Sequence, residues 1–321
     1  MIETAASSKN LSRASTKTLA GRTMPKWVRK VPLHLLLVVL MIIMLTPFIW
    51  MLGMSLKPDA EATPNALDGV SRDIGTWSGF FWPKGGLQFG NYVTAWTEHF
   101  DPAQPQVSFW DAPFTGYYIN SLVAGFGQVF GVLITSTLAA FAFARMEFYG
   151  KNVLFVFLLA TLTIPAEATY LPNLVIVTNL GMSNTLLALF VPWTASVFSI
   201  FLLRQFFMSI PPDLYEAGQM DGLNDLGYLW QIALPLSSAA VLTSALFSFM
   251  GSWNSLLWPL IAAPNTPTVQ LGLKSFISNG DTQTQWNVLM AGSTISILPI
   301  VVLYFLVQRR FIEGIARSGV K

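Results

Sequence analysis

The sequence predicts an all-α membrane protein with six transmembrane helices. Only 11% of the 321 residues are charged, against about 25% in an ordinary soluble domain, and 53% are hydrophobic with a mean hydropathy of +0.54. Crossing a hydrocarbon core of about 30 Å takes about 20 apolar helical residues. Six stretches meet that length, at approximately 33–56, 118–144, 153–177, 185–207, 229–250 and 288–307.

The first apolar stretch follows a basic N-terminal segment, as a signal peptide would. At roughly 24 residues it exceeds the usual h-region of 7–15, and no A-x-A-like cleavage site closes it, so it is predicted to be a span. Residues 1–32 combine Ser, Thr, Lys and Arg without apolar periodicity. They are predicted to form a flexible basic cytoplasmic arm near anionic lipid, with a specific protein partner as the alternative.

The distribution of basic residues predicts the orientation of the chain, because translocated loops tend to lack lysine and arginine. Placing both termini in the cytoplasm puts most of the 18 basic residues inside, including those of the tail 311–321. Four others, Lys57, Arg72, Lys84 and Lys274, fall in long external segments, where the rule carries less weight. The external segment 57–117 is rich in aromatic residues. We interpret it as an aromatic belt, with a docking surface for an extracytoplasmic partner as the alternative.

Several classes of chemistry are unsupported by the sequence. It contains no cysteine and two histidines, which argues against thiolate chemistry and a metal cluster. The phosphate-binding pattern Gly-x-x-x-x-Gly-Lys-Ser/Thr does not occur, since Val320 follows the nearest glycine pair, Gly314 and Gly319. No catalytic residue, bound cofactor or metal is therefore predicted, and the chain is expected not to be an enzyme.

Glu167 is the one clear acidic residue within the apolar cores. It lies between Pro165 and Pro172, which are expected to loosen the third span and free carbonyls toward a polar cavity. Contact with interfacial water explains Glu167 equally well. A carrier coupled to protons or sodium usually has several such residues, so a single acid makes an ion-coupled secondary transporter the alternative function.

The longest internal cytoplasmic loop, 204–223, predicts a short helix at about 213–222. Asp213 follows two prolines and precedes Glu216 by three, the spacing of a capping box, and Gly222 is suited to a left-handed end. Four residues share one face by the i, i+3, i+4 rule. Small residues there would let a partner approach closely, although local ordering of the loop is an alternative. The four are Leu214, Ala217, Gly218 and Asp221.

This loop resembles the EAA loop of bacterial ATP-binding-cassette importer permeases. The resemblance rests on Glu216-Ala217-Gly218, Asp221-Gly222 and the later Ile232-Ala233-Leu234-Pro235. In that family the loop is the coupling helix, which fits a cleft on the cytoplasmic ATPase. The resemblance implies the type I importer permease fold. It also implies an ATPase-coupling role for Leu214, Glu216, Ala217, Gly218, Asp221 and Gly222.

Further stretches are similar to carbohydrate-uptake permeases, and the tail from Gln308 to Lys321 is similar to the maltose-type second permease (MalG-like). The chain departs from the family pattern at three positions. Gly218 replaces alanine, which lowers the stability of the helix by up to ~1 kcal/mol. Ala239 replaces a frequent proline, which predicts a milder bend at the start of the fifth span. Ser255 replaces a common glutamate. The stretches are 89–92, 120–121, 139–145, 179–185, 201–207 and 251–260.

The resemblance implies a permease in the bacterial inner membrane that forms half of a pore for a sugar, a di- or oligosaccharide. Its implied partners are a second, MalF-like permease, an ATPase dimer that binds ATP and Mg, and an extracytoplasmic sugar-binding protein. The predicted five-helix core is 118–310. The candidates to line the sugar cavity are Asn120, Ser121, Glu167, Trp253 and Asn254, with helix packing or interfacial anchoring as the alternative for the tryptophan and asparagines.

Overall fold

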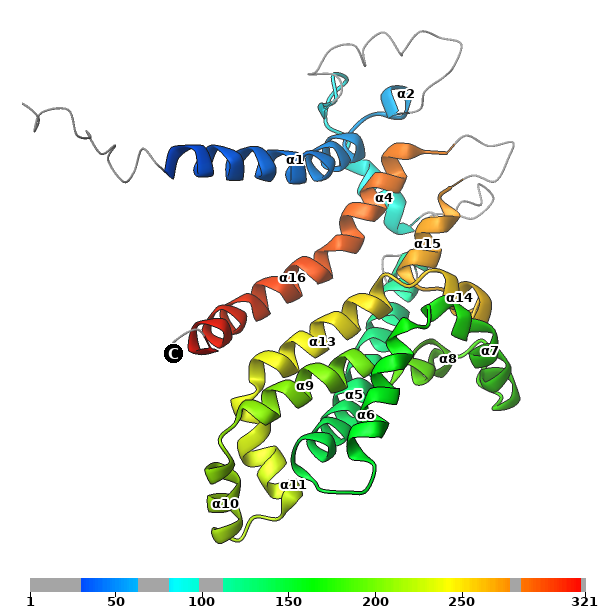
Figure 1. The fold of residues 1–321 in the computed structure, drawn as a ribbon. Helices are drawn as coiled ribbons and strands as arrows, with labels where there is room; N and C mark the ends of the chain where they lie inside the picture. The colour runs from blue at the N-terminus through cyan, green and yellow to red at the C-terminus, as the bar shows by residue number, and fades with distance from the viewer. Residues whose placement is uncertain (1–29, 63–80, 98–111, 278–283, 319–321) are drawn as a thin grey trace, which may run out of the picture. The chain divides into compact units, whose positions relative to one another are not determined.

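The computed structural model describes residues 30–62, 81–97, 112–277 and 284–318, with side chains up to residue 308, and these residues form helices and short connections (Figure 1). Residues 1–29 of the predicted arm, much of the external segment and all side chains of the tail 311–321 lie outside the described residues. The chain divides into two compact units, Met1–Trp50 and Met51–Lys321. The helix α1, Val31–Ser55, begins in the first unit and is an uncharged apolar run.

The second unit is built around the 33-residue helix α5, Pro113–Arg145. Pro113 occupies the first helical position, where its missing N–H costs nothing. α5 packs against α9, Val197–Ser209, and α13, Ser238–Trp253 (Figure 1). α16, Trp286–Ser318, packs against α13 and the short helix α4, Gly90–Thr97. Three short helices also belong to this unit: α2, Asp59–Ala62, α14, Leu257–Ala262, and α15, Val269–Ser275.

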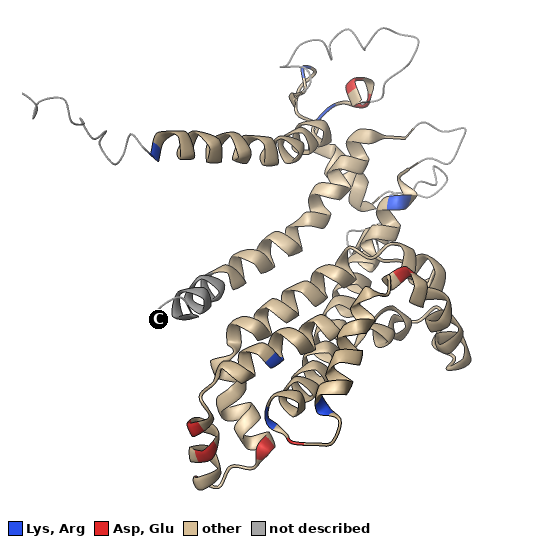
Figure 2. Ribbon diagram, in the orientation of Figure 1, with Lys and Arg blue, Asp and Glu red and all other residues tan. Residues whose placement is uncertain are grey.

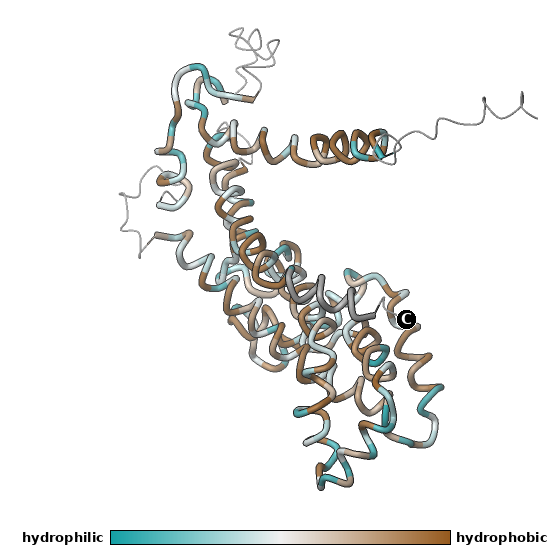
Figure 3. Tube along the Cα trace, turned by 90° about the vertical axis from the view of Figure 1, so that its left-hand side faces the viewer, coloured by the Kyte–Doolittle hydropathy of each residue, from teal (hydrophilic) through white to brown (hydrophobic). Residues whose placement is uncertain are grey.

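Three of the six predicted spans are straight helices, and the other three are bent pairs. α1, α5 and α16 are each long and apolar enough to cross a membrane, and counting each bent pair as one span raises the number of candidates to six. Figure 3 shows their apolar character, with hydrophilic residues concentrated in the connecting turns. The described part of the chain therefore supports between three and six spans.

The third predicted span is broken at Pro165. α6, Lys151–Ala160, and the 3-10 turn η3, Thr161–Thr163, precede the break. The turn η4, Ala166–Thr169, and α7, Tyr170–Asn179, follow it at 101°. Proline has no N–H to continue the helix and drives the preceding residue out of the helical region, as the extended Ile164 (φ −81°, ψ 121°) demonstrates. The loosening expected from the prolines is confirmed at Pro165, whereas Pro172 lies in the first turn of α7 without a further break.

The fourth and fifth spans break in a similar way. α8, Leu186–Phe190, and η5, Val191–Trp193, meet α9 at 48°. α11, Asp225–Tyr228, the π-helical turn η6, Leu229–Ala233, and α12, Leu234–Leu236, meet α13 at 84°. The bend is 84° although alanine stands at position 239. Pro235 and the π turn already interrupt the hydrogen-bond ladder before residue 239, so a second proline is not required.

Glycines on α5 allow the helices to approach closely. A Cβ at Gly125 would lie 2.8 Å from the Phe249 ring of α13, and one at Gly127 would lie 3.0 Å from the Phe190 ring of α8. At Gly131 it would overlap Thr194. Gly127 and Gly131 therefore serve helix packing.

Candidate functional sites

The helix predicted in the internal loop is α10, Pro212–Met220. It begins earlier than expected: Pro211 is the N-cap and makes no side-chain capping bond, while Asp213 lies in the first turn. The predicted capping box at Asp213 is therefore wrong. Pro212 fits the first helical position with its fixed φ, so the helix starts before Asp213 can act as a cap. The carboxylate of Asp213 still lies near the helix N-terminus, where negative charge is favourable.

The end of α10 is as predicted. Gly222 has a left-handed backbone (φ 85°), which glycine adopts without steric cost. The amide of Leu223 donates to the carbonyl of Gly218 at 2.9 Å, and that of Gly222 donates to Gln219 at 3.0 Å. This pair of bonds is a Schellman motif, which satisfies carbonyls left free at the helix end.

The predicted face of α10 is split between the protein interior and the surface. Leu214, Glu216 and Asp221 are exposed, whereas Gly218 is buried. A Cβ at Gly218 would lie 3.1 Å from Tyr228 and 3.4 Å from Ile232, both on the following elements of the same chain. The expectation that Gly218 presents its small surface to another protein is corrected: its missing side chain makes room for Tyr228. Ala217 is half-buried and Gly222 exposed.

Side chains outside the predicted set hold α10 in place. The hydroxyl of Tyr215 donates to Asp225 Oδ1 at 2.6 Å, and its ring lies edge-on to Tyr228 with centroids 4.9 Å apart. The bond to Asp225, and secondarily burial, raises the pKa of Tyr215. Arg145 Nη2 donates to the carbonyls of Phe207 at 2.9 Å and Ile210 at 2.5 Å, linking the end of α5 to the end of α9. Arg145 and Tyr215 were missed by sequence reasoning.

The five predicted cavity residues do not come together. Trp253 is 1% exposed, stacks on Phe249 with centroids 5.5 Å apart, and donates from Nε1 to Ser296 at 3.0 Å. Trp253 belongs to the core and lines neither the 240 Å³ pocket nor the 440 Å³ cavity. The alternative prediction, that this tryptophan serves helix packing, fits the structure. Asn120 donates to the carbonyl of Pro267, and Asn254 donates to that of Met250.

Ser121 and the surroundings of Glu167 lie at a pocket of about 240 Å³. Ser121 lines it, and its hydroxyl also accepts the amide of Val269 at 2.8 Å. Glu167 itself is exposed and does not line the pocket, but its neighbour Ala166 does. The lining residues are Ser121, Ala124, Gln128, Ala166, Tyr170, Leu189, Trp193, Gly251, Ser252, Ser255, Trp258, Pro259 and Thr268.

Three aromatic residues form one wall of this pocket. Trp193 and Trp258 are perpendicular with centroids 5.4 Å apart, and Tyr170 lies 5.7 Å from Trp193 and 5.8 Å from Trp258. Trp258 is fixed by a bond from Nε1 to the carbonyl of Ala188 at 2.9 Å. Asn184 has a left-handed backbone (φ 58°) and accepts the amide of Asn265 through Oδ1, joining the two loops beside the wall.

The polar groups of the pocket are all neutral. Thr268 is 4% exposed, and its hydroxyl has no hydrogen-bond partner among the described residues. Such a buried hydroxyl costs free energy unless a ligand or water satisfies it. Gln128, Ser252 and Ser255 add further donors and acceptors. The arrangement suits an uncharged, hydroxyl-rich molecule with an apolar face that can stack on aromatic rings.

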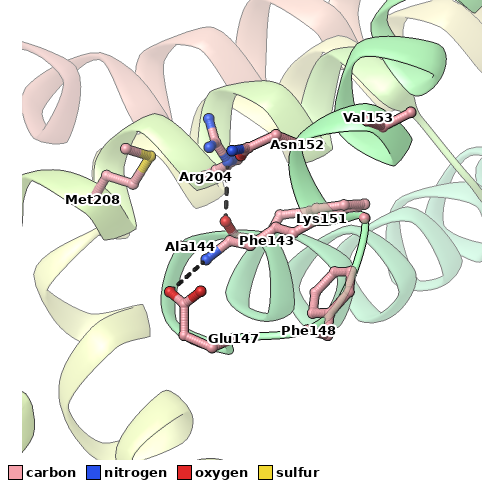
Figure 4. Close-up of a pocket in the computed structure, with 10 residues that line it drawn as sticks. Phe143, Ala144, Glu147, Phe148, Lys151, Asn152, Val153, Arg204 and Met208 are labelled. Atoms are coloured by element: carbon pink, nitrogen blue, oxygen red, sulfur yellow. Dashed lines mark hydrogen bonds and ion pairs between the residues drawn. The ribbon is translucent and has the colours of Figure 1, made fainter.

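A larger cavity, about 440 Å³, lies at the turn between α5 and α6 and beside α9 (Figure 4). Arg204 Nε donates to the carbonyl of Phe143 at 3.1 Å, and the guanidinium lies 4.0 Å above the Phe155 ring. Lys151 pairs with Glu147 at 3.2 Å. Figure 2 shows charged residues in this turn and acidic residues on α10 and α11. The described residues contain no group of three side chains that would hold a metal ion.

Comparison with known proteins gives a consistent result. Residues 131–317 match the family model described as "Binding-protein-dependent transport system inner membrane component". The chain is 35% identical over 209 residues to the sn-glycerol-3-phosphate transport system permease protein UgpE of Salmonella typhi, covering 64% of this chain and 74% of that protein. The UgpE protein of Yersinia enterocolitica is 34% identical over 209 residues, with the same shares covered.

A solved structure shares the fold. It is a chain of a bacterial ABC transporter involved in the import of the acidic polysaccharide alginate. The TM-score is 0.70 at 24% sequence identity, and the match covers 91% of this chain and 99% of that one. The chain therefore shares the overall fold of that transporter chain.

Proposed function

We propose a function for this chain, which belongs to the family of binding-protein-dependent transport system inner membrane components. That family consists of transport permeases rather than enzymes. In our proposal the chain forms half of the translocation pore of a sugar importer and receives force from separate ATPase subunits through α10. The observation that carries the proposal is the construction of α10, which is tied to its own chain by Tyr215 while Leu214 and Glu216 are exposed.

The proposed topology has six spans, with both termini in the cytoplasm. Each bent pair then counts as one span, with a proline in its break or shortly before it. Arg145 bonds to the carbonyls of Phe207 and Ile210 just before α10, and Lys151 and Arg204 line the cavity at the same end of α5. This cluster of basic residues supports a cytoplasmic location for that end. α10 is then positioned to meet a cytoplasmic ATPase.

Force transmission follows from the contacts of α10. Its inner surface packs against Tyr228. Arg145 joins the end of α5 to the end of α9, and α10 follows α9 along the chain. A displacement of α10 therefore moves these helices as a body rather than bending a loose loop. In the proposed coupling role, Leu214, Glu216 and Asp221 contact the ATPase, while Ala217, Gly218 and Gly222 shape and support the helix.

The proposed partners are a second, MalF-like permease, an ATPase dimer that holds ATP and Mg, and an extracytoplasmic sugar-binding protein. The family description supports a binding protein, and the absence of a phosphate-binding loop from the sequence supports a separate ATPase. The second permease would complete the substrate pathway. The pocket of about 240 Å³ is smaller than the roughly 300–1,000 Å³ typical of ligand sites, which fits a half-site.

We propose that this pocket contacts the transported sugar. Tyr170, Trp193 and Trp258 offer ring faces and edges to the apolar side of a sugar, and Thr268 and Gln128 offer hydrogen bonds. The matched relatives are named for sn-glycerol-3-phosphate and the matched structure for alginate, which are anionic. The neutral lining of the pocket supports an uncharged di- or oligosaccharide for this chain.

Uptake with and without the ATPase tests the proposal. The chain and its second permease are reconstituted in vesicles, with the binding protein outside, and labelled sugar uptake is measured with ATP inside. We expect uptake only when the ATPase is included. Uptake driven by a proton or sodium gradient without ATPase, and lost in Glu167→Gln, would instead establish an ion-coupled carrier. Absence of uptake with every component present would contradict both.

A further inference from the structure

The cavity between the α5–α6 turn and α9 has no role in the proposed transport cycle. Its volume of about 440 Å³ is set by the ends of two helices and by the turn 146–150 (Figure 4). Gly150 adopts a left-handed backbone (φ 78°), which lets the turn reverse sharply into α6. Arg204 approaches from α9, a segment more than 50 positions later in the sequence. The cavity is thus a product of the fold rather than of one loop.

The charge of the cavity is predominantly positive. Arg204 is held by the Phe143 carbonyl and the Phe155 ring, and no described carboxylate pairs with it. Lys151 donates to the carbonyl of Met146 at 2.8 Å and to Glu147, whose side chain is 90% exposed. An ion pair with so exposed a partner is weak and easily exchanged. Two cations and one displaceable acid therefore line a space large enough for a phosphate group.

The cavity continues into an exposed apolar surface. Val153 lines the cavity and is 60% exposed, and Val156 and Phe157 follow it on the same face of α6, 63% and 69% exposed. Met208 of α9 forms another apolar edge and is 52% exposed. A ligand that matches both parts has an anionic head and an extended apolar tail.

We propose that this cavity binds the headgroup phosphate of an anionic phospholipid, with an acyl chain along the exposed face of α6. Arg204 and Lys151 would supply the charge, and Asn152 a further polar contact. In the proposed topology the cavity faces the cytoplasmic leaflet, whose anionic lipids attract basic residues. Arg204 suits a phosphate because its planar guanidinium can donate two parallel hydrogen bonds. This site is independent of the transported sugar.

Glu147 acts as an internal competitor in this proposal. The Glu147 carboxylate is paired with Lys151, and a bound phosphate would displace this carboxylate. Removing the Glu147 charge should therefore tighten lipid binding, whereas removing the Lys151 charge should weaken it. Opposite effects from two neighbouring substitutions are a specific signature, because nonspecific damage to the turn would weaken binding in both cases.

The test uses the assembled full-length importer in neutral detergent. Binding of dioleoyl phosphatidylglycerol and dioleoyl phosphatidylcholine is measured by native mass spectrometry. We expect a preference for phosphatidylglycerol that falls about fivefold in Lys151→Gln, persists in Lys151→Arg and rises in Glu147→Gln. Lys274→Gln is the matched control, because it removes an exposed lysine on α15 and should leave the preference unchanged.

Two further arms identify the source of the phosphate. Inorganic phosphate at concentrations equal to the lipid should not displace it, and Phe157→Ser should weaken lipid binding without creating phosphate binding. Equal binding of both lipids, or identical effects of Lys151→Gln and Lys274→Gln, would overturn the proposal. Displacement by equimolar inorganic phosphate would also overturn it. Lipid binding that is seen with the isolated chain but is lost in the assembled importer would also overturn the proposal, because another subunit would then cover this face.

Discussion

The bond between Tyr215 and Asp225 predicts how firmly α10 is attached. Tyr215→Phe removes the hydroxyl that donates to Asp225 at 2.6 Å and keeps the ring that lies 4.9 Å from Tyr228. A hydrogen bond to a charged group contributes about 1.5–3 kcal/mol when buried. Because Tyr215 is only partly buried, water replaces some of that contribution. We therefore expect a loss of about 1 kcal/mol in the local opening free energy, or roughly fivefold in the opening equilibrium.

Hydrogen exchange of α10 measures that opening. The amides of Asp221 and Leu223 donate within the end of the helix, so a peptide covering them should exchange about fivefold faster in Tyr215→Phe. Asp225→Ala should produce a similar change, and the double variant should add little, because each substitution removes the same bond. Tyr149→Phe is the control, because Tyr149 is fully exposed. Unchanged exchange in Tyr215→Phe, or additive effects of the two substitutions, would refute the reasoning.

Three other substitutions or conditions test neighbouring features. Gly218→Leu should separate α10 from the Tyr228 ring, because even a Cβ would lie 3.1 Å from it, and should increase exchange across α10. Met220→Leu, at a position 83% exposed, should not. Thr268→Val should raise the free energy of unfolding of the sugar-free protein by about 1 kcal/mol and should raise the KM for uptake. A lower free energy of unfolding would show that the hydroxyl already has a hydrogen-bond partner. The raised pKa of Tyr215 implies that its contribution to stability is complete below pH 10 and is lost as pH rises through the folded-state pKa. The opening equilibrium of α10, obtained from exchange rates corrected for intrinsic base catalysis, should therefore rise there in the wild type but not in Tyr215→Phe.

The spans were predictable from the sequence because apolar length is a one-dimensional property. α1, α5 and α16 follow directly from it. The proline at 165 also predicted a loosened helix, but the 101° bend depends on what packs around the break. The 84° bend of the fifth span could not be predicted, since the π turn before Pro235 leaves no mark in a proline count. Such breaks decide the architecture and are only partly encoded in local sequence.

The faces of helices were harder to predict than the helices themselves. Helical spacing placed Leu214 and Gly218 together on α10, but it contains no information on where Tyr228 folds back. At the pocket, sequence reasoning chose Trp253, whereas Trp258 forms the wall. The helix ends at Trp253, and the chain turns before Trp258, so the two rings enter separate packing clusters. Side-chain direction after a helix break requires the three-dimensional structure.

Cross-linking of α10 tests the central claim that this helix receives force from an ATPase. The sequence contains no cysteine, so a single introduced thiol has no background. Leu214→Cys, at a residue 41% exposed, is paired with a cysteine placed in the cleft of the ATPase subunit, and Tyr149→Cys serves as an exposed control on the α5–α6 turn. We predict a cross-link from position 214 whose formation halts ATP-dependent uptake until it is reduced. Cross-linking from position 149 but not 214, or uptake unaffected by the cross-link at 214, would contradict the account.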